Sequence, residues 1–151
     1  MWERVKAIHP YVKTCEVSID AGTKKTYETK TRIGGKLDVL LENLKFITTI
    51  DTIQFFSFSF VVQDSNFREM KLFYDIITNC MKGSKSKFDV FYNSITNWGT
   101  YSEEQYEIKD VSNSYNKLHN DFLKELDRLK NVNNVTHNFN HLIDPIQKSL
   151  I

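Results

Sequence analysis

Residues 101–132 constrain the fold most, because they have the pattern of one long amphipathic helix. Ser102 and Gln105 form a capping box at its start, in which each side chain can bond the backbone N–H of the other residue. A helix of about thirty residues would be roughly 45 Å long, which is long for a chain of this size. Its apolar positions are Tyr101, Ile108, Val111, Tyr115, Leu118, Phe122 and Leu129.

These apolar positions are a candidate interaction surface for a partner helix or for a second copy of the chain. The alternative is that the helix packs across its own domain. Aromatic residues favour this alternative, since two-stranded coiled coils use Ile, Val and Leu at such positions. The sequence alone leaves both interpretations open.

Alternating polar and apolar residues predict strands in the first half of the chain. Residues 11–20 and 23–33 have this pattern on either side of an Ala-Gly turn, which predicts an antiparallel hairpin. Residues 52–63 give the strongest strand pattern, because phenylalanine alternates with serine there. The sequence therefore predicts a small antiparallel sheet near the N-terminal half.

Helical spacing of apolar residues predicts that this sheet is packed by helices, at residues 2–9, 36–47, 67–81 and 88–98. Asp144 and Pro145 have the pattern of an N-cap and first turn of a short terminal helix. The expected fold is α+β in a single domain of residues 1–151, with one long C-terminal amphipathic helix. The alternative is an all-α helical bundle in which residues 36–82 are nearly continuous helix.

The charge balance gives no global attraction to nucleic acid, because the formal net charge is +1. Two local groups of basic residues are nevertheless candidates for anion binding, one in the second predicted strand and one in a Gly- and Ser-containing loop. An alternative function is therefore binding of nucleic acid or an anionic surface, although lysines also commonly protect exposed strands and loops. These basic residues are Lys24, Lys30, Arg32, Lys82, Lys85 and Lys87.

Motifs for enzymatic chemistry are missing from the sequence, which has no phosphate-binding P-loop, no Gly-rich dinucleotide loop and no Gly-x-Ser-x-Gly elbow. His137 and His141 are weak metal-ligand candidates, because a helix would stack residues four apart on one face. His119 or Asp144 would supply a third ligand for a metal-dependent enzyme, the third hypothesis. We expect no cofactor and two reduced thiols at the two cysteines.

The composition indicates a soluble, intracellular protein. The most apolar run, residues 53–62, is about half of a membrane span, and no signal peptide is visible. Abundant Asn, Lys, Ile and Tyr are typical of an AT-rich genome. The leading hypothesis is a non-enzymatic protein–protein interaction or regulatory protein that presents its long helix to a protein partner or forms a homodimer; a phage or viral inhibitor of a host protein fits this description.

Overall fold

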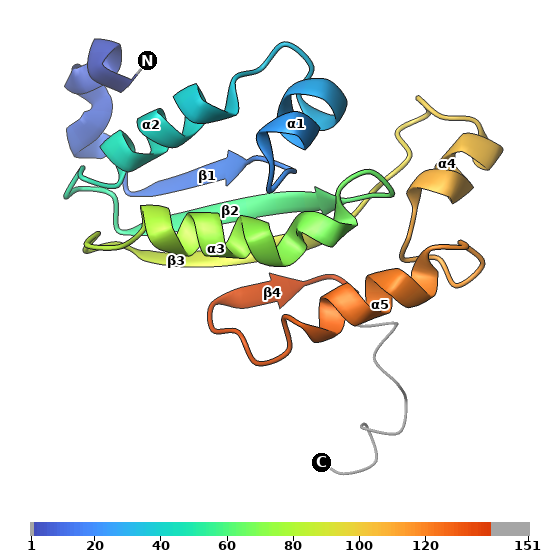
Figure 1. Cartoon of the computed structure of the whole chain (residues 1–151). Coiled ribbons are helices and arrows are strands. Elements are labelled where there is room, and N and C mark those ends of the chain that lie inside the picture. The colour runs from blue at the N-terminus through green and yellow to red at the C-terminus, as the bar shows by residue number, and fades with distance from the viewer. Residues whose placement is uncertain (1, 140–151) are drawn as a thin grey trace.

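The computed structural model describes residues 2–139, which form an α/β fold around a parallel sheet (Figure 1). Its four strands lie side by side in the order of the chain. Every neighbouring pair is parallel, and β2 and β3 pair over eight residues each. The strands are β1 (Thr14–Ser18), β2 (Phe55–Val62), β3 (Lys87–Ser94) and β4 (Val135–His137).

Helices fill the connections between these strands. Because the strand order never reverses and parallel crossovers share one hand, the connecting helices are expected on the same face of the sheet. The core agrees with this arrangement, since α2, α3 and α5 all contribute to one buried cluster. The helical elements are η1 (Trp2–Tyr11), α1 (Lys24–Thr26), η2 (Tyr27–Thr31), α2 (Leu37–Ile47), η3 (Phe67–Glu69), α3 (Met70–Cys80), α4 (Glu103–Lys109) and α5 (His119–Asp127).

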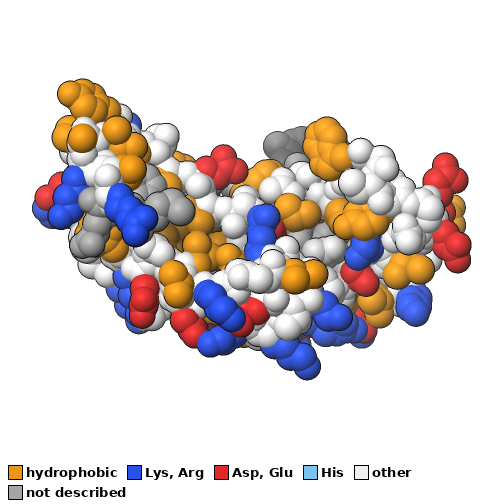
Figure 2. All heavy atoms as spheres, turned by 90° about the horizontal axis from the view of Figure 1, so that it is seen from above, with side chains coloured by type: hydrophobic (Ala, Val, Ile, Leu, Met, Phe, Trp, Pro, Cys, Tyr) orange, Lys and Arg blue, Asp and Glu red, His pale blue; other side chains and the backbone are white. Residues whose placement is uncertain are grey.

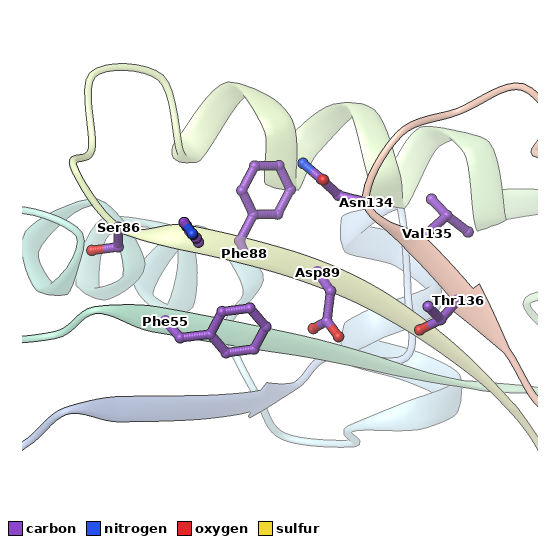
Figure 3. Close-up of a pocket in the computed structure, with 8 residues that line it drawn as sticks. Phe55, Ser86, Phe88, Asp89, Asn134, Val135 and Thr136 are labelled. Atoms are coloured by element: carbon purple, nitrogen blue, oxygen red, sulfur yellow. The ribbon is translucent and has the colours of Figure 1, made fainter.

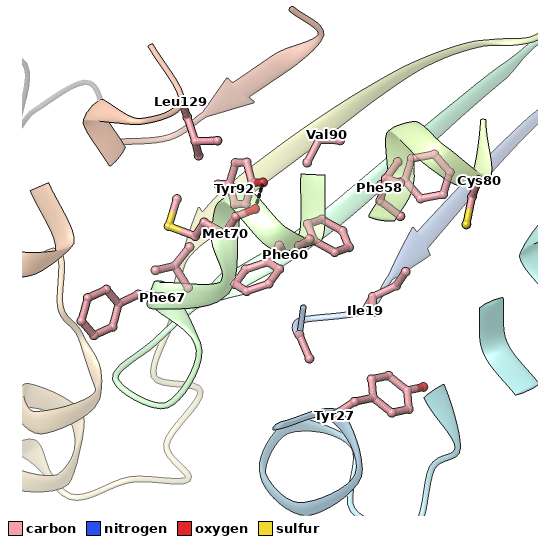
Figure 4. Close-up of a cluster of buried hydrophobic side chains, with 14 of the residues drawn as sticks. Ile19, Tyr27, Phe58, Phe60, Phe67, Met70, Cys80, Val90, Tyr92 and Leu129 are labelled. Carbon is pink, nitrogen blue, oxygen red and sulfur yellow. Dashed lines mark hydrogen bonds between the residues drawn. The ribbon is translucent and has the colours of Figure 1, made fainter. Parts of the chain in front are cut away.

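The core lies between the helices and the phenylalanine-rich face of β2. Phe56, Phe58 and Phe60 are completely buried there, and the Phe60 ring centroid lies 5.0 Å from that of Phe73 in α3. On β3, the Tyr92 hydroxyl donates to the Met70 carbonyl oxygen at 2.7 Å, as the dashed line in Figure 4 marks. Burial raises the pKa of Tyr92 far above its usual value. This hydrogen bond therefore persists over the whole physiological pH range.

The predicted antiparallel hairpin is wrong, and so is the antiparallel sheet. Residues 11–20 do contain a strand, β1, but it pairs in parallel with β2, and residues 23–33 contain α1 and η2 instead of a second strand. Glu69 explains the difference, because its carboxylate accepts the backbone N–H groups of Gly22 and Thr23 at 2.8 and 2.9 Å. This residue lies more than forty positions away in the sequence, so local alternation cannot reveal it.

The predicted long C-terminal helix is also wrong, because α4 and α5 are separate helices. The capping box of Ser102 and Gln105 is confirmed at the start of α4. Between the helices, the side chains of Asp110, Asn113 and Asn116 each accept the backbone N–H two residues ahead. Three successive turns of this kind break the helix, since they offer the backbone a competing set of hydrogen bonds.

The predicted helix at residues 88–98 is wrong, since most of this segment is β3. Aromatic residues on both of its faces give an apparent helical period, although the alternation of Phe88, Val90 and Tyr92 toward the core is a strand pattern. The all-α alternative is excluded by β2. The helices at 36–47 and 67–81 and the strand at 52–63 are confirmed. The predicted helix at Asp144 lies outside the described residues.

We expect Glu69→Ala to lower the free energy of unfolding by about 2–4 kcal/mol, because it removes several hydrogen bonds to a charged acceptor. The carboxylate also accepts the hydroxyls of Thr23 and Thr26, at 2.8 and 2.5 Å. Urea unfolding followed by circular dichroism measures the loss. Glu104→Ala, in the exposed first turn of α4, is the control and should change stability by less than about 0.5 kcal/mol. Equal midpoints for the two variants would contradict this role of Glu69.

Candidate functional site

Parallel α/β proteins bind ligands at the carboxyl ends of their strands. At this edge, β1 leads into Asp20, a buried residue with a positive φ of 61°. Its Oδ1 accepts the N–H of Val61 at 2.8 Å, and its Oδ2 forms an ion pair with Arg32 at 2.7 Å. The carboxylate thus extends the pairing of β1 and β2 by one further bond.

Asn66 completes this cluster from the turn after β2. Its side-chain amide donates to the carbonyl oxygens of Asp20 and Val61, and its Oδ1 accepts the N–H of Gln63 at 2.8 Å. Asp20 and Asn66 are both buried. Their polar atoms are occupied by bonds that hold the strand ends together, so this cluster stabilises the edge and offers no free acid or base to a ligand.

The same edge at β3 and β4 carries His137. Its Nδ1 accepts the backbone N–H of Phe139 at 3.3 Å, and its ring packs 5.6 Å from the Phe139 ring. Burial lowers the pKa of His137 below its ordinary value of 6.5, so the imidazole is neutral at pH 7. The neighbouring contact joins Asn138 Oδ1 to the N–H of Ser94 at 2.9 Å. These bonds tie β4 to β3 and bring no second titratable group to His137.

The sheet face opposite the helices is the more unusual feature. No described helix covers it, whereas parallel sheets are normally covered on both faces. Phe55, Val61 and Phe91 lie on this face and are only partly buried. We call it the uncovered face; its residues are Thr14, Glu16, Ser18, Phe55, Ser57, Ser59, Val61, Lys87, Asp89, Phe91, Asn93 and Thr136.

On the uncovered face, the two charged residues of β3 have no ion-pair partner among the described residues. The Asp89 Oδ1 atom is buried, and no hydrogen bond reaches it from the described residues. Lys87, two residues earlier on the same face, is exposed and forms no ion pair within residues 2–139. Figure 3 shows Asp89 on the same side of the sheet as Phe55, with Phe88 on the opposite side. Asp89 as a whole is only partly buried, so its carboxylate can still be approached and can accept a cationic or hydrogen-bonding group.

A cavity of about 680 Å³ opens beside Asp89, where β4 is too short to pair with the start of β3. Phe55, Phe88, Asn134 and Thr136 contribute to its lining (Figure 3). It lies at the amino ends of the strands, which in related topologies serve stability rather than catalysis. The cavity therefore extends the uncovered face at the amino ends of the strands.

A second cavity, of about 450 Å³, includes the predicted lysine loop. Lys45, Lys82 and Lys85 contribute to its lining beside the C-terminal ends of α2 and α3. Helix C-termini carry partial negative charge, so these lysines offset the helix dipoles. Asp51 pairs with Lys85 at 3.2 Å. The arrangement disfavours a bound anion.

The remaining predicted basic residues do not join that loop. Lys24 is paired with Asp38, Arg32 is paired with Asp20, and Lys30 lies in the last turn of η2. These residues follow β1, at the carboxyl ends of the strands, whereas the 82–87 loop precedes β3 at the amino ends. The two groups therefore do not form one basic surface.

The residues of the predicted helix surface are also divided. Val111, Phe122 and Leu129 are buried in the core, while Ile108 and Tyr115 are 54% and 96% exposed. Tyr101 and Leu118 are partly buried. The break between α4 and α5 thus separates residues that a continuous helix would have aligned.

The predicted metal ligands cannot be compared as a set, because His141 and Asp144 lie outside the described residues. His119 binds the Val111 carbonyl through Nδ1 at 3.0 Å, and His137 is engaged as described above. Among residues 2–139, no group of three or more His, Cys, Asp or Glu side chains is placed to hold a metal ion.

Comparisons of the chain with protein-family models, curated proteins and solved structures find no match. In the described part of the chain, no helix combines the length and apolar character needed to cross a bilayer. The uncovered face was not found from the sequence, although the alternation of Lys87, Asp89 and Phe91 was a signal for its third strand.

We expect the lowered pKa of His137 to make the protein less stable at acidic pH. The ordinary pKa of histidine is 6.5. At pH values below 6.5, His137 binds a proton more readily in the unfolded chain than in the folded chain. The free energy of unfolding should therefore fall with pH below this value, and His137→Gln should lose that part of the dependence. Urea unfolding at about pH 7.5 and about pH 5.5 measures the effect. An NMR titration midpoint for His137 at or above 6.5 would contradict it.

Proposed function

We propose that this protein is a non-enzymatic interaction protein that binds a second copy of itself through the uncovered face of its parallel sheet. The observation that carries the proposal is the unpartnered Asp89 carboxylate beside the unpaired Lys87 on that face. The polar clusters at the carboxyl edge support a non-enzymatic role, because their atoms are occupied by internal bonds.

A two-fold axis near β3 makes these two charges complementary. In a symmetric dimer, if one residue contacts a second across the interface, the reciprocal contact is also made. Lys87 of one copy would then lie against Asp89 of the other, twice. This arrangement supplies the Asp89 carboxylate with a donor and neutralises both charges away from water.

The size of the uncovered face shows what else the dimer needs. Its strands cover roughly 20 Å by 20 Å, or about 400 Å² on each copy. Specific interfaces bury about 600–1,000 Å² on each partner. The dimer would therefore need further contacts beyond the strands themselves, and exposed apolar side chains near the strand ends are available: Tyr11 is 82% exposed and Trp98 is 86% exposed.

The test is the solution mass of the purified protein over a concentration series, measured by light scattering. We expect a mass above that of one chain, 17.8 kDa, that approaches twice this value. Lys87→Asp should raise the dimer dissociation constant at least about tenfold, because it places like charges against each other. The combined Lys87→Asp and Asp89→Lys variant should restore association.

Lys117→Asp is the matched control, since it makes the same charge change at an exposed position between α4 and α5. It should leave the mass unchanged, and circular dichroism should show all variants folded. A mass of one chain at every concentration would refute self-association. Equal weakening by the single and combined variants would refute the charge pairing across the axis.

A further inference from the structure

The outer edge of β1 has the properties of a site for an added strand. The backbone hydrogen bonds between β1 and β2 include those of Lys13 and Ile19. The N–H and C=O groups of the odd-numbered residues of β1 therefore point toward β2. Glu16, at the centre of the strand, directs its N–H and C=O away from the sheet. Within the described chain, no residue bonds to these two groups. Such an edge can pair with an extended peptide.

A cavity of about 140 Å³ lies directly beside this edge, under α2. Cys15 and Val17 of β1 line one side, and Leu40, Leu44 and Ile47 of α2 line the other. In another protein, an apolar cavity of about 150 Å³ accommodates one benzene molecule. This cavity is therefore the right size for one aliphatic side chain from a neighbouring strand.

The other side of the edge carries a charge. Glu16 is exposed and forms no ion pair within residues 2–139. It contributes to the rim of the cavity, and the alternation along β1 places its side chain on the side of the uncovered face. In an added strand, the residue opposite Glu16 would point to the same side, while its two neighbours would point toward the cavity. Figure 2 views the molecule from above, the β1 side, and shows hydrophobic side chains accessible between charged ones.

We propose that the β1 edge binds an extended segment of a partner protein in which an Arg or Lys stands between two aliphatic residues. The backbone of Glu16 binds the segment, the Glu16 carboxylate pairs with the basic residue, and one aliphatic side chain fills the cavity under α2. The site lies along the β1 edge and shares only the Glu16 carboxylate with the uncovered face, whereas the charge pair proposed for self-association lies on β3.

A second copy of β1 is a poor occupant of the same edge. Antiparallel pairing of two β1 strands about their centres pairs all five residues and places Glu16 opposite Glu16. A shift by one residue moves every side chain to the other face, and a shift by two shortens the pairing. The charge therefore disfavours the register that pairs the whole strand and favours a basic partner.

The test uses the full chain and a synthetic peptide, acetyl-Ser-Thr-Val-Arg-Leu-Thr-Ser-amide, titrated by NMR. We expect amide shifts concentrated at Thr14–Ser18, with methyl shifts at Leu40 and Leu44. A peptide with Glu in place of Arg should bind at least about tenfold more weakly. Glu16→Lys should reverse this preference, and Glu42→Lys, the same change on the exposed side of α2, should not.

Cysteine alkylation gives an independent measurement on the same protein. The Arg peptide should slow the reaction of Cys15, which lines the cavity, and leave the rate at buried Cys80 unchanged. Shifts confined to the cavity beside Asp89, no shifts at millimolar peptide, or a peptide preference that Glu16→Lys leaves unchanged would each overturn the proposal. Because none of these measurements depends on the mass of the protein, their failure is distinguishable from failure of self-association.

Discussion

The burial of one face of β2 under α2 and α3 is the interaction on which the rest of the structure depends. Phe56, Phe58 and Phe60 are completely buried there, and the neighbouring strands align their own apolar residues with this row. With a strand order that never reverses, one helix from each connection, α2, α3 and α5, contributes to the same face. The molecule therefore has a single core on one side of its sheet, and the other side has no helix from the described chain.

This one-sided arrangement explains where the unusual polar groups lie. At the carboxyl edge, Asp20, Asn66 and Glu69 satisfy backbone groups that would otherwise be left without partners where strands and helices begin or end. On the uncovered face and along the outer edge of β1, groups with no internal partner remain. Among the described residues, no donor reaches the buried Asp89 oxygen and no cation pairs with Glu16, and both residues lie beside partly buried apolar side chains. The functional proposals follow from this contrast between satisfied and unsatisfied groups.

The sequence predicted elements best where the local signal and the tertiary environment agree. The alternation of phenylalanine and serine correctly predicted the strand β2, and the leucine stripe correctly predicted the helix α2. The capping box predicted the start of α4, but three Asx turns ended that helix early, because side chains of Asp and Asn compete for backbone N–H groups. In β3, aromatic residues on both faces concealed the strand period. Of the predicted site residues, Lys87 lies on the uncovered face, but the sequence placed it in a basic loop, since an unpaired charge is a property of three-dimensional surroundings.

By itself, the sequence determined that an aromatic-rich core exists, where β2, α2 and α3 lie, and how α4 begins, because each depends on residues close together in the chain. Only the tertiary structure decided that the sheet is parallel and that residues 23–33 are helical. The first depends on which strands pair, and the second on a carboxylate, Glu69, more than forty residues away. It also decided which charges stay unpaired, since pairing is set by distance in space and not by position in the chain.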